Sequence, residues 1–197
     1  MKNTLPLSLH IPEPKARPGE PVDFGGVIVP PAGDAPRPPI NCAAEDTREL
    51  ANGLIRVLDD DGAAVGPWNP RLDLERLKQG LRTMLLVRAF DERMYRQQRQ
   101  GKTSFYLKCT GEEAVSVAAA MALDAEDMCF PTYRQQGFLI ARGYPLTQMM
   151  NQCYSNAADP LKGRQLPVLY SSRAHGFFTV SGNLGTQFSQ AILLSCL

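Results

Sequence analysis

The chain has 197 residues, of which 44% are hydrophobic and 21% are charged, and these values are typical of a soluble globular domain. Its 21 basic and 20 acidic residues give a net charge of +1, so it lacks the basic footprint of a nucleic-acid-binding protein. No apolar run approaches the roughly 20 residues of a membrane span, and the first residues lack the apolar core of a secretory signal. We therefore expect a cytoplasmic protein that binds neither nucleic acid nor membrane.

Proline dominates the N-terminal part, because ten of the sixteen prolines lie in the first forty residues. Since proline fixes φ and removes a backbone donor, residues 12–40 are not expected to form regular helix or central strand. Residues 1–45 are either a disordered tail or an extended arm along a partner subunit, with Phe24 and Val27–Val29 as apolar side chains to bury. Residues 46–70 are expected to be a connector, with a strand over 54–58 and a turn at Asp59–Gly62.

Residues 71–197 are expected to form the main domain, which begins with a long helix. Asp73 is placed to cap it, and apolar residues recur at three- and four-residue spacing as far as about residue 100. The apolar positions in its first turns are Leu74, Leu77, Leu81, Met84 and Leu85.

The next helix is predicted to start with a capping box, in which Thr110 is the cap and Glu113 the third residue. It runs from Glu113 to Leu123 and is rich in small residues, which suits close approach of another backbone. Further helices are predicted over residues 135–142, over 145–154 with Pro145 as the first helical residue, and from Thr186 onward.

Short apolar runs at residues 128–130, 168–170 and 177–180 are predicted to be strands. Strands and helices alternate along the chain, so the predicted fold class is α/β. The cysteines are an odd set without a CxxC pair, which favours reduced packing residues over a zinc site or a disulfide framework. They are Cys42, Cys109, Cys129, Cys153 and Cys196.

Three segments lie where α/β sheets place ligands, at strand ends or in turns. Tyr133-Arg134 follows the first strand, and an arginine there can bind phosphate oxygens with its forked guanidinium. The loop Lys162–Arg164 could close over an anion, and the oxygen-rich turn Ser181–Gln187 could hold a monovalent cation or a heterocycle. Taken singly, each segment is better explained without a function: Tyr133-Arg134 as ordinary surface, Lys162–Arg164 as a solvated charge cluster and Ser181–Gln187 as a plain turn.

Histidine chemistry is not indicated. His10 lies in the proline-rich part and His175 in a loop, and the chain contains no Ser-His-Asp set, histidine-rich cluster or evident acidic pair. We assign no catalytic residue.

In order and spacing, these segments resemble the α subunits of thiamine-diphosphate-dependent 2-oxoacid dehydrogenases. The resemblance spans about Trp68 to Gln190 and rests on the runs GKTSFYLKCTGEEA, FPTYRQQG, DPLKGRQLPVLYSS and TVSGNLGTQ. The stretch Gly163–Pro167 looks like the branched-chain (2-oxoisovalerate) type, and the proline-rich arm resembles the extension of bacterial members.

The resemblance implies a thiamine-diphosphate-binding fold, in which a parallel sheet is flanked by helices. It also implies an α2β2 heterotetramer with an E1 β subunit. Such an enzyme decarboxylates a branched-chain 2-oxoacid on thiamine diphosphate and passes the acyl group to the lipoyl domain of E2.

Carried over residue by residue, the resemblance gives Tyr133 and Arg134 as diphosphate contacts, and Gly182 and Leu184 as neighbours of the aminopyrimidine ring. A potassium ion that stiffens the turn is expected at four residues. These are Ser181, Asn183, Thr186 and Gln187. Gly182 replaces a common serine and Asn183 a common proline, so a side-chain contact is lost and the turn is less rigid.

The family anchors Mg²⁺ and diphosphate with a Gly-Asp-Gly about thirty residues after the Thr-Gln pair, whereas only ten residues follow Gln187 here. We therefore expect a truncated subunit, through an interrupted reading frame or an incomplete sequence. Alone, it is expected to be inactive and to bind thiamine diphosphate poorly. Two alternatives are a non-catalytic fragment that binds a β subunit, and an α subunit that acts on pyruvate or acetoin.

Overall fold

The computed structural model describes residues 19–21, 29–51 and 53–195, which fall into two compact units, Met1–Arg71 and Leu72–Leu197. In the first unit the 3-10 helix η1 covers Ala44–Ala51. The predicted turn at Asp59 is confirmed, because the Asp59 carboxylate accepts hydrogen bonds from the backbone N–H groups of Asp61 (3.1 Å) and Ala63 (2.8 Å). The predicted strand over 54–58 is reduced to one antiparallel bridge, between Leu58 and Ala64.

Part of the proline-rich segment packs against this connector. The N–H of Gly33 donates to the Arg56 carbonyl (2.8 Å), and Trp68 Nε1 donates to the Pro36 carbonyl (3.2 Å). Phe24 and the first two residues of Val27–Val29 lie outside the described residues, so the partner-binding arm stays a prediction.

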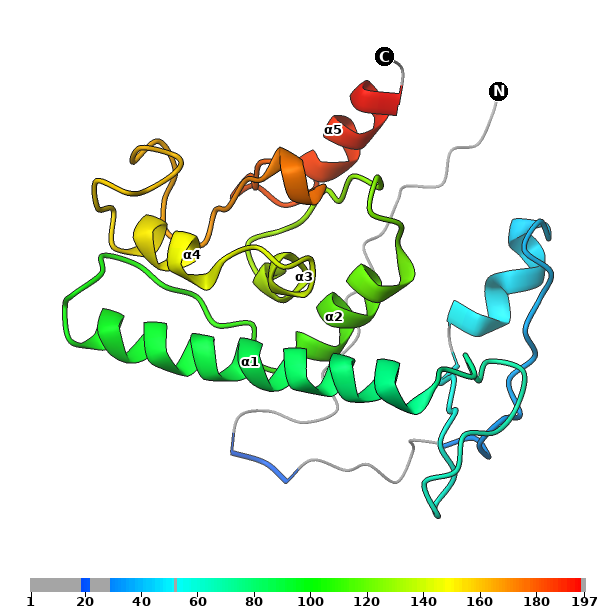
Figure 1. The fold of residues 1–197 in the computed structure, drawn as a ribbon. Coiled ribbons are helices and arrows are strands. Elements are labelled where there is room, and N and C mark those ends of the chain that lie inside the picture. Colours follow the sequence, from blue (N-terminus) through cyan, green and yellow to red (C-terminus); the bar gives the residue numbers. More distant parts are fainter. Residues whose placement is uncertain (1–18, 22–28, 52, 196–197) are drawn as a thin grey trace. The chain divides into compact units, whose positions relative to one another are not determined.

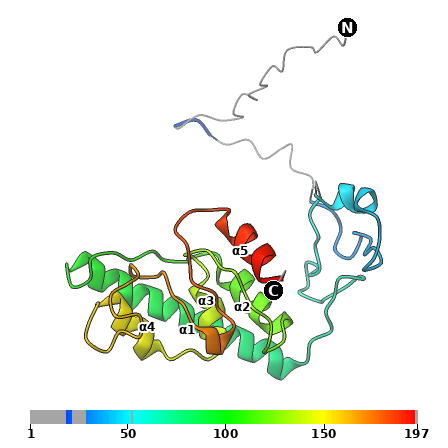
Figure 2. The ribbon, with the colours of Figure 1, turned by 90° about the horizontal axis from the view of Figure 1, so that it is seen from above.

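The second unit is built on the long helix α1, Leu74–Arg99. Its cap is the predicted one, because Asp73 Oδ1 accepts from the N–H of Arg76 (2.8 Å). Helix α2 (Glu113–Ala122) packs over the N-terminal half of α1 and α4 (Leu146–Cys153) over its C-terminal half, with α3 (Gln136–Ala141) between them (Figures 1 and 2). The 3-10 helix η2 covers Arg173–His175, and α5 (Thr186–Ser195) starts at the predicted residue.

Two predicted helix starts are wrong in detail. Thr110 does not cap α2, because the cap residue is Glu112 and its side chain makes no capping bond. The Glu113 carboxylate instead accepts hydrogen bonds from the N–H of Gly111 (2.8 Å) and from Arg88 Nε on α1. Pro145 is the cap of α4 and not its first helical residue, with the extended backbone (ψ 126°) that precedes a helix.

The core of the second unit lies between α1 and the three helices above it. Close approach at its centre depends on small residues, because a Cβ on Gly137 of α3 would lie 3.1 Å from the Cβ of Ser116 on α2. Cys109 and Cys153 are buried in this core, and the thiols in the described residues are free, as predicted. The buried apolar residues include Val87, Phe90, Met94, Phe138, Leu139, Met149, Tyr170 and Phe177.

The described residues contain bridges but no strand, so the parallel sheet stays a prediction. Predicted strands 128–130 and 177–180 do meet, in one parallel bridge between Cys129 and Phe177. Two hydrogen bonds form this bridge: the N–H of Cys129 donates to the Gly176 carbonyl (2.7 Å), and the N–H of Phe178 donates to the Cys129 carbonyl (2.9 Å). The ladder stops there because Pro131, two residues on, has no N–H to donate.

Within the described part of the chain, no helix combines the length and the apolar character of a membrane span. Among the described helices only α1 is long enough, and charged side chains recur along it.

Candidate functional site

The Tyr133–Arg134 pair lies directly after the Cys129 bridge, in the bend between the extended segment and α3. Both side chains are half-buried, and the Arg134 guanidinium carbon lies 5.7 Å from the centre of the Tyr133 ring. Arg134 Nη1 donates to the backbone carbonyl of Lys108 at 2.5 Å. A guanidinium has five N–H groups, so this bond fixes Arg134 while leaving donors for an anion.

The turn Ser181–Gln187 is closed by its own polar groups. Ser181 Oγ accepts from the N–H of Asn183 (3.3 Å), and the Asn183 carbonyl accepts from Thr186 Oγ1 (2.8 Å). Gln187 Oε1 accepts from the N–H of Gly185 (3.0 Å). The oxygens predicted to bind potassium are therefore gathered in one turn, and a carbonyl or hydroxyl oxygen that accepts one hydrogen bond keeps a second lone pair for a cation.

Gln187 joins the two predicted halves of the site. Its side chain is buried, and its Nε2 donates to the carbonyl of Pro131 at 3.3 Å, fifty-six residues away in the chain. Pro131 comes two residues before Tyr133, so the start of α5 is tied to the segment that carries the predicted diphosphate contacts. The rest of the turn is open to solvent, because Gly182, Asn183 and Leu184 are exposed.

A buried network behind Arg134 has no counterpart in the sequence prediction. Asp91 of α1 is fully buried, and its Oδ1 accepts from the Tyr106 hydroxyl (2.7 Å) and from Gln136 Nε2 (3.0 Å). Its Oδ2 accepts from the N–H of Cys109 (2.7 Å). Burial, reinforced by Asp91, raises the pKa of the Tyr106 hydroxyl far above its ordinary value, so Tyr106 stays a hydrogen-bond donor.

This network holds both segments that meet at Arg134. Gln136 Nε2 also donates to the Leu107 carbonyl (3.1 Å), next to the Lys108 carbonyl that receives Arg134. Asp91 therefore fixes residues 106–109 on one side of Arg134 and Gln136 on the other. The partners are 15 to 45 residues from Asp91 in the chain, so no local pattern could have revealed them.

Two ion pairs reinforce the same region, one from α1 to the first residue of α2 and one from α1 to the segment before α2. Arg88 Nε lies 2.5 Å from the buried carboxylate of Glu113, and Lys108 pairs with Glu92. The hydrogen bond from Arg88 holds the pKa of Glu113 below its usual value, and the bond from Lys108 does the same for the pKa of Glu92.

The loop Lys162–Arg164 is not joined to these groups by any hydrogen bond or ion pair within the described residues. The loop backbone is held by the buried side chain of Asp159, whose carboxylate accepts hydrogen bonds from the N–H groups of Leu161 (2.9 Å) and Gly163 (2.7 Å). Lys162 and Arg164 are exposed. An anion-closing role for this loop stays a prediction.

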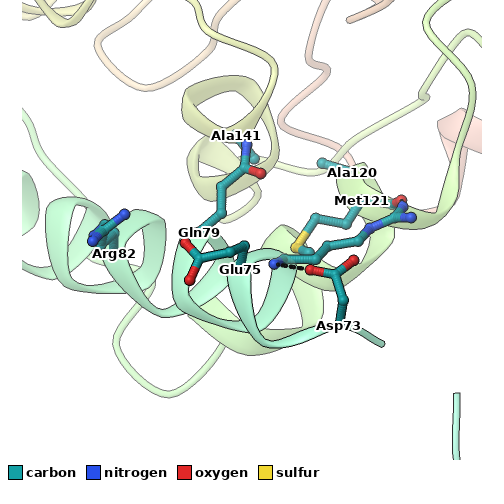
Figure 3. Close-up of a pocket in the computed structure, with 8 residues that line it drawn as sticks. Asp73, Glu75, Gln79, Arg82, Ala120, Met121 and Ala141 are labelled. Carbon is teal, nitrogen blue, oxygen red and sulfur yellow. Dashed lines mark hydrogen bonds between the residues drawn. The ribbon is translucent and has the colours of Figure 1, made fainter. Parts of the chain in front are cut away.

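An open pocket of about 680 Å³ lies elsewhere, between the first turns of α1 and the ends of α2 and α3 (Figure 3). It is lined by none of the predicted site residues. Its walls combine charged, amide and apolar side chains, namely Asp73, Glu75, Arg76, Gln79, Arg82, Ala120, Met121 and Ala141.

Among the described residues there is also no group of three His, Cys, Asp or Glu side chains that could hold a metal ion. The described part of the chain therefore offers donors for an anion and oxygens for a monovalent cation, and no carboxylate cluster for Mg²⁺.

Comparison with known proteins gives two matching families and several relatives. A family described as Dehydrogenase E1 component matches residues 81–194, and one described as 2-oxoisovalerate dehydrogenase E1 alpha subunit N terminal matches residues 5–45. The chain is 57% identical over 192 residues to the 2-oxoisovalerate dehydrogenase subunit alpha of Pseudomonas aeruginosa, which covers 98% of this chain and 47% of that protein.

Mitochondrial proteins are similar over a shorter stretch. The 2-oxoisovalerate dehydrogenase subunit alpha of Mus musculus is 41% identical over 140 residues, covering 71% of this chain and 32% of that protein. Subunit alpha 1 of Arabidopsis thaliana is 40% identical over 141 residues, covering 69% and 29%. The chain thus spans about half the length of the bacterial relative and about a third of the others.

Proposed function

The chain belongs to the dehydrogenase E1 component family, and from that premise we propose that it supplies part of a thiamine-diphosphate site for the oxidative decarboxylation of branched-chain 2-oxoacids. Membership of this family implies a thiamine-diphosphate-type fold and the use of that cofactor. The relatives named above are 2-oxoisovalerate dehydrogenase α subunits, which supports the branched-chain substrate over pyruvate or acetoin.

The observation that carries the proposal is the bond between Gln187 and the Pro131 carbonyl. It ties together two segments that are needed at opposite ends of one cofactor, although they are far apart in the chain. The residues present fit the group, because Arg134 keeps free guanidinium donors and the exposed turn offers backbone groups at Gly182 and Leu184.

Each residue has a defined role in this proposal. Arg134, held by the Lys108 carbonyl, binds the diphosphate oxygens, and Tyr133 donates its hydroxyl beside it. The backbone at Gly182 and Leu184 orients the aminopyrimidine ring. The cofactor supplies the electron sink for decarboxylation, and the protein supplies placement and electrostatics.

Potassium binding at the turn is part of the same proposal. Oxygens of Ser181, Asn183, Thr186 and Gln187 would hold the cation, and the hydrogen bonds that already close the turn bring these oxygens together. The cation would stiffen a turn in which an asparagine, and not a proline, stands at position 183.

The proposed partners are an E1 β subunit in an α2β2 assembly and the lipoyl domain of an E2 component, in the cytoplasm. Mg²⁺ would be anchored by groups other than those described, because no metal-binding acidic cluster is present among them. We therefore expect the 197-residue chain alone to be inactive and to show no micromolar binding of thiamine diphosphate with Mg²⁺ by calorimetry. Such a chain could still bind a β subunit without catalysing the reaction.

A chimera tests the catalytic proposal. This chain replaces the matching 192 residues of the P. aeruginosa relative, which is produced with its companion subunits and assayed with 2-oxoisovalerate and with pyruvate. We expect turnover with a preference for 2-oxoisovalerate. Arg134→Met should raise the apparent KM for thiamine diphosphate about 10- to 100-fold, because a charge-assisted contact is lost.

Arg93→Met is the matched control, since Arg93 is exposed on α1 and makes no bond to the site, and it should change that KM less than about twofold. A chimera that prefers pyruvate would contradict the substrate assignment. An Arg134→Met chimera with unchanged cofactor dependence would contradict the role of Arg134.

A further inference from the structure

The Arg134 side chain is held at both of its ends. Its backbone lies in the bend before α3, and Gln135 closes this bend, because Gln135 Oε1 accepts from the hydroxyl (2.8 Å) and the N–H of Thr132. Its guanidinium donates to the Lys108 carbonyl, in the segment that leads to α2. The direction of the guanidinium therefore depends on how the bend is placed relative to that segment.

Gln136 joins these two places. It is the first residue of α3, two residues after Arg134, and its side chain is buried. Its Nε2 donates to Asp91 Oδ1 (3.0 Å) and to the Leu107 carbonyl (3.1 Å), one residue before the carbonyl that holds Arg134. The Gln136 amide thus links the bend that carries Arg134 to the segment that binds the guanidinium.

Both linked segments are also held independently of Gln136. Asp91 fixes residues 106–109, because it accepts from the Tyr106 hydroxyl (2.7 Å) and from the N–H of Cys109 (2.7 Å). The residues of α3 that follow Gln136 are buried in the core as far as position 140. Removing the Gln136 amide therefore leaves each segment in place and loosens the link between them.

This link matters for an anion because an arginine side chain has several rotatable bonds. Ordering such a side chain on binding costs affinity, and a binding group that is already held in place avoids that cost. The Lys108 carbonyl directs Arg134, and Gln136 keeps this carbonyl in register with the bend. Because the Gln136 side chain is shut off from the surface, its effect on a bound anion has to pass through Arg134.

We propose that Gln136 is a positioning residue for Arg134, which directs the guanidinium and thereby sets the affinity for the diphosphate group of the cofactor. The inference rests on the proposed function, in which Arg134 binds diphosphate oxygens. If Gln136 had only a structural role, its replacement would lower the free energy of unfolding without changing the affinity for diphosphate.

Calorimetry on the cofactor-free chimera, assembled with its companion subunits, tests the proposal. The chimera is titrated in Mg²⁺ with thiamine diphosphate and separately with inorganic diphosphate, because these two ligands share the diphosphate group alone. Gln136→Met, which keeps a similar volume and removes the donor, should raise both dissociation constants about fivefold. Gln97→Met is the matched control, because the buried Gln97 amide bonds to the Tyr154 hydroxyl (3.0 Å) at the end of α4, and both constants should change less than about twofold.

A double-variant cycle tests whether Gln136 acts through Arg134. Arg134→Met alone should raise both dissociation constants about 10- to 100-fold, and adding Gln136→Met should change them by less than about a further twofold. Gln136→Asn is a milder second variant, for use if Gln136→Met does not assemble. Its amide is one methylene too short to reach both acceptors, so both constants should rise about threefold.

The outcomes separate this inference from the proposed function. The inference is overturned if Gln136→Met and Gln136→Asn bind inorganic diphosphate as the parent does, or if the loss is undiminished in the Arg134→Met background. Either result leaves the role of Arg134 intact. Unchanged affinity in Arg134→Met would contradict the proposed function, and the inference with it. Thermal melting followed by circular dichroism measures the structural contribution separately, because Gln136→Met and Gln97→Met should both lower the melting temperature.

Discussion

Replacing Asp91 by alanine removes the common acceptor of the buried network next to Arg134. Its carboxylate accepts from the Tyr106 hydroxyl, the Cys109 N–H and Gln136 Nε2. After the replacement, the first two donors have no acceptor and are shut off from water, whereas Gln136 keeps the Leu107 carbonyl. At about 1–3 kcal/mol for each orphaned donor, the free energy of unfolding should fall by about 2–6 kcal/mol.

Tyr106→Phe is the matched control, because it removes one hydrogen bond and leaves no buried donor without a partner. It should cost about 1 kcal/mol, since Asp91 retains its two other donors. Urea denaturation at pH 7, followed by far-ultraviolet circular dichroism, measures both changes. If Asp91→Ala costs no more than Tyr106→Phe, the network does not stabilise the unit and the reasoning is wrong.

Two further predictions concern an ion pair and a tight glycine. Because Arg88 lowers the pKa of Glu113, the pair stabilises the fold above the ordinary pKa near 4.5, and this stabilisation is lost as pH falls through the lowered pKa. The difference in free energy of unfolding between the parent and Arg88→Met should therefore be largest at pH 7 and should shrink in urea titrations at acid pH. Gly176→Ala should lower the free energy of unfolding by about 2 kcal/mol or more, because φ is +59° and a Cβ would lie 2.4 Å from the Asp127 carbonyl oxygen. Gly182→Ala is the control, because no atom lies within 4 Å of the added Cβ, and it should change the free energy of unfolding by less than about 0.5 kcal/mol.

Features that depend on neighbours in the chain were predictable. The cap at Asp73, the turn at Asp59 and the start of α5 at Thr186 are all found where the sequence indicates them. Each depends on a side chain bonding to a backbone group a few residues away, or on a short helical pattern, so a local reading is sufficient.

Features that depend on distant partners were not predictable. The capping box at Thr110 satisfies the local pattern, yet Glu113 is drawn to Arg88 on another helix. Helical spacing correctly indicates α1, but two of its sides are apolar, and the more regular row of leucines is the exposed one. Only the packing of α2, α3 and α4 selects the side with Phe90 and Met94 as the core.

The candidate site is a prediction from family resemblance, and the structure adds how the segments that carry it are held. The resemblance predicts that Arg134 and the turn at residues 181–187 lie around one ligand. The sequence contains no sign of the Gln187 bond to Pro131 or of the Asp91 network, because both join segments tens of residues apart. The sheet stays a prediction, since strand pairing requires ladders longer than the single bridge at Cys129.

The two buried thiols allow the opening of the core to be measured through the rate at which they are chemically modified. Cys109 and Cys153 are shielded by the core, and burial raises the pKa of both, so little reactive thiolate forms while the core is closed. An alkylating reagent can therefore modify them only when the core opens, and the rate of modification reports the free energy of that opening. Cys153, 3.3 Å from the hydroxyl of Tyr170, reports on the α4 side, and Cys109 reports on the Asp91 side.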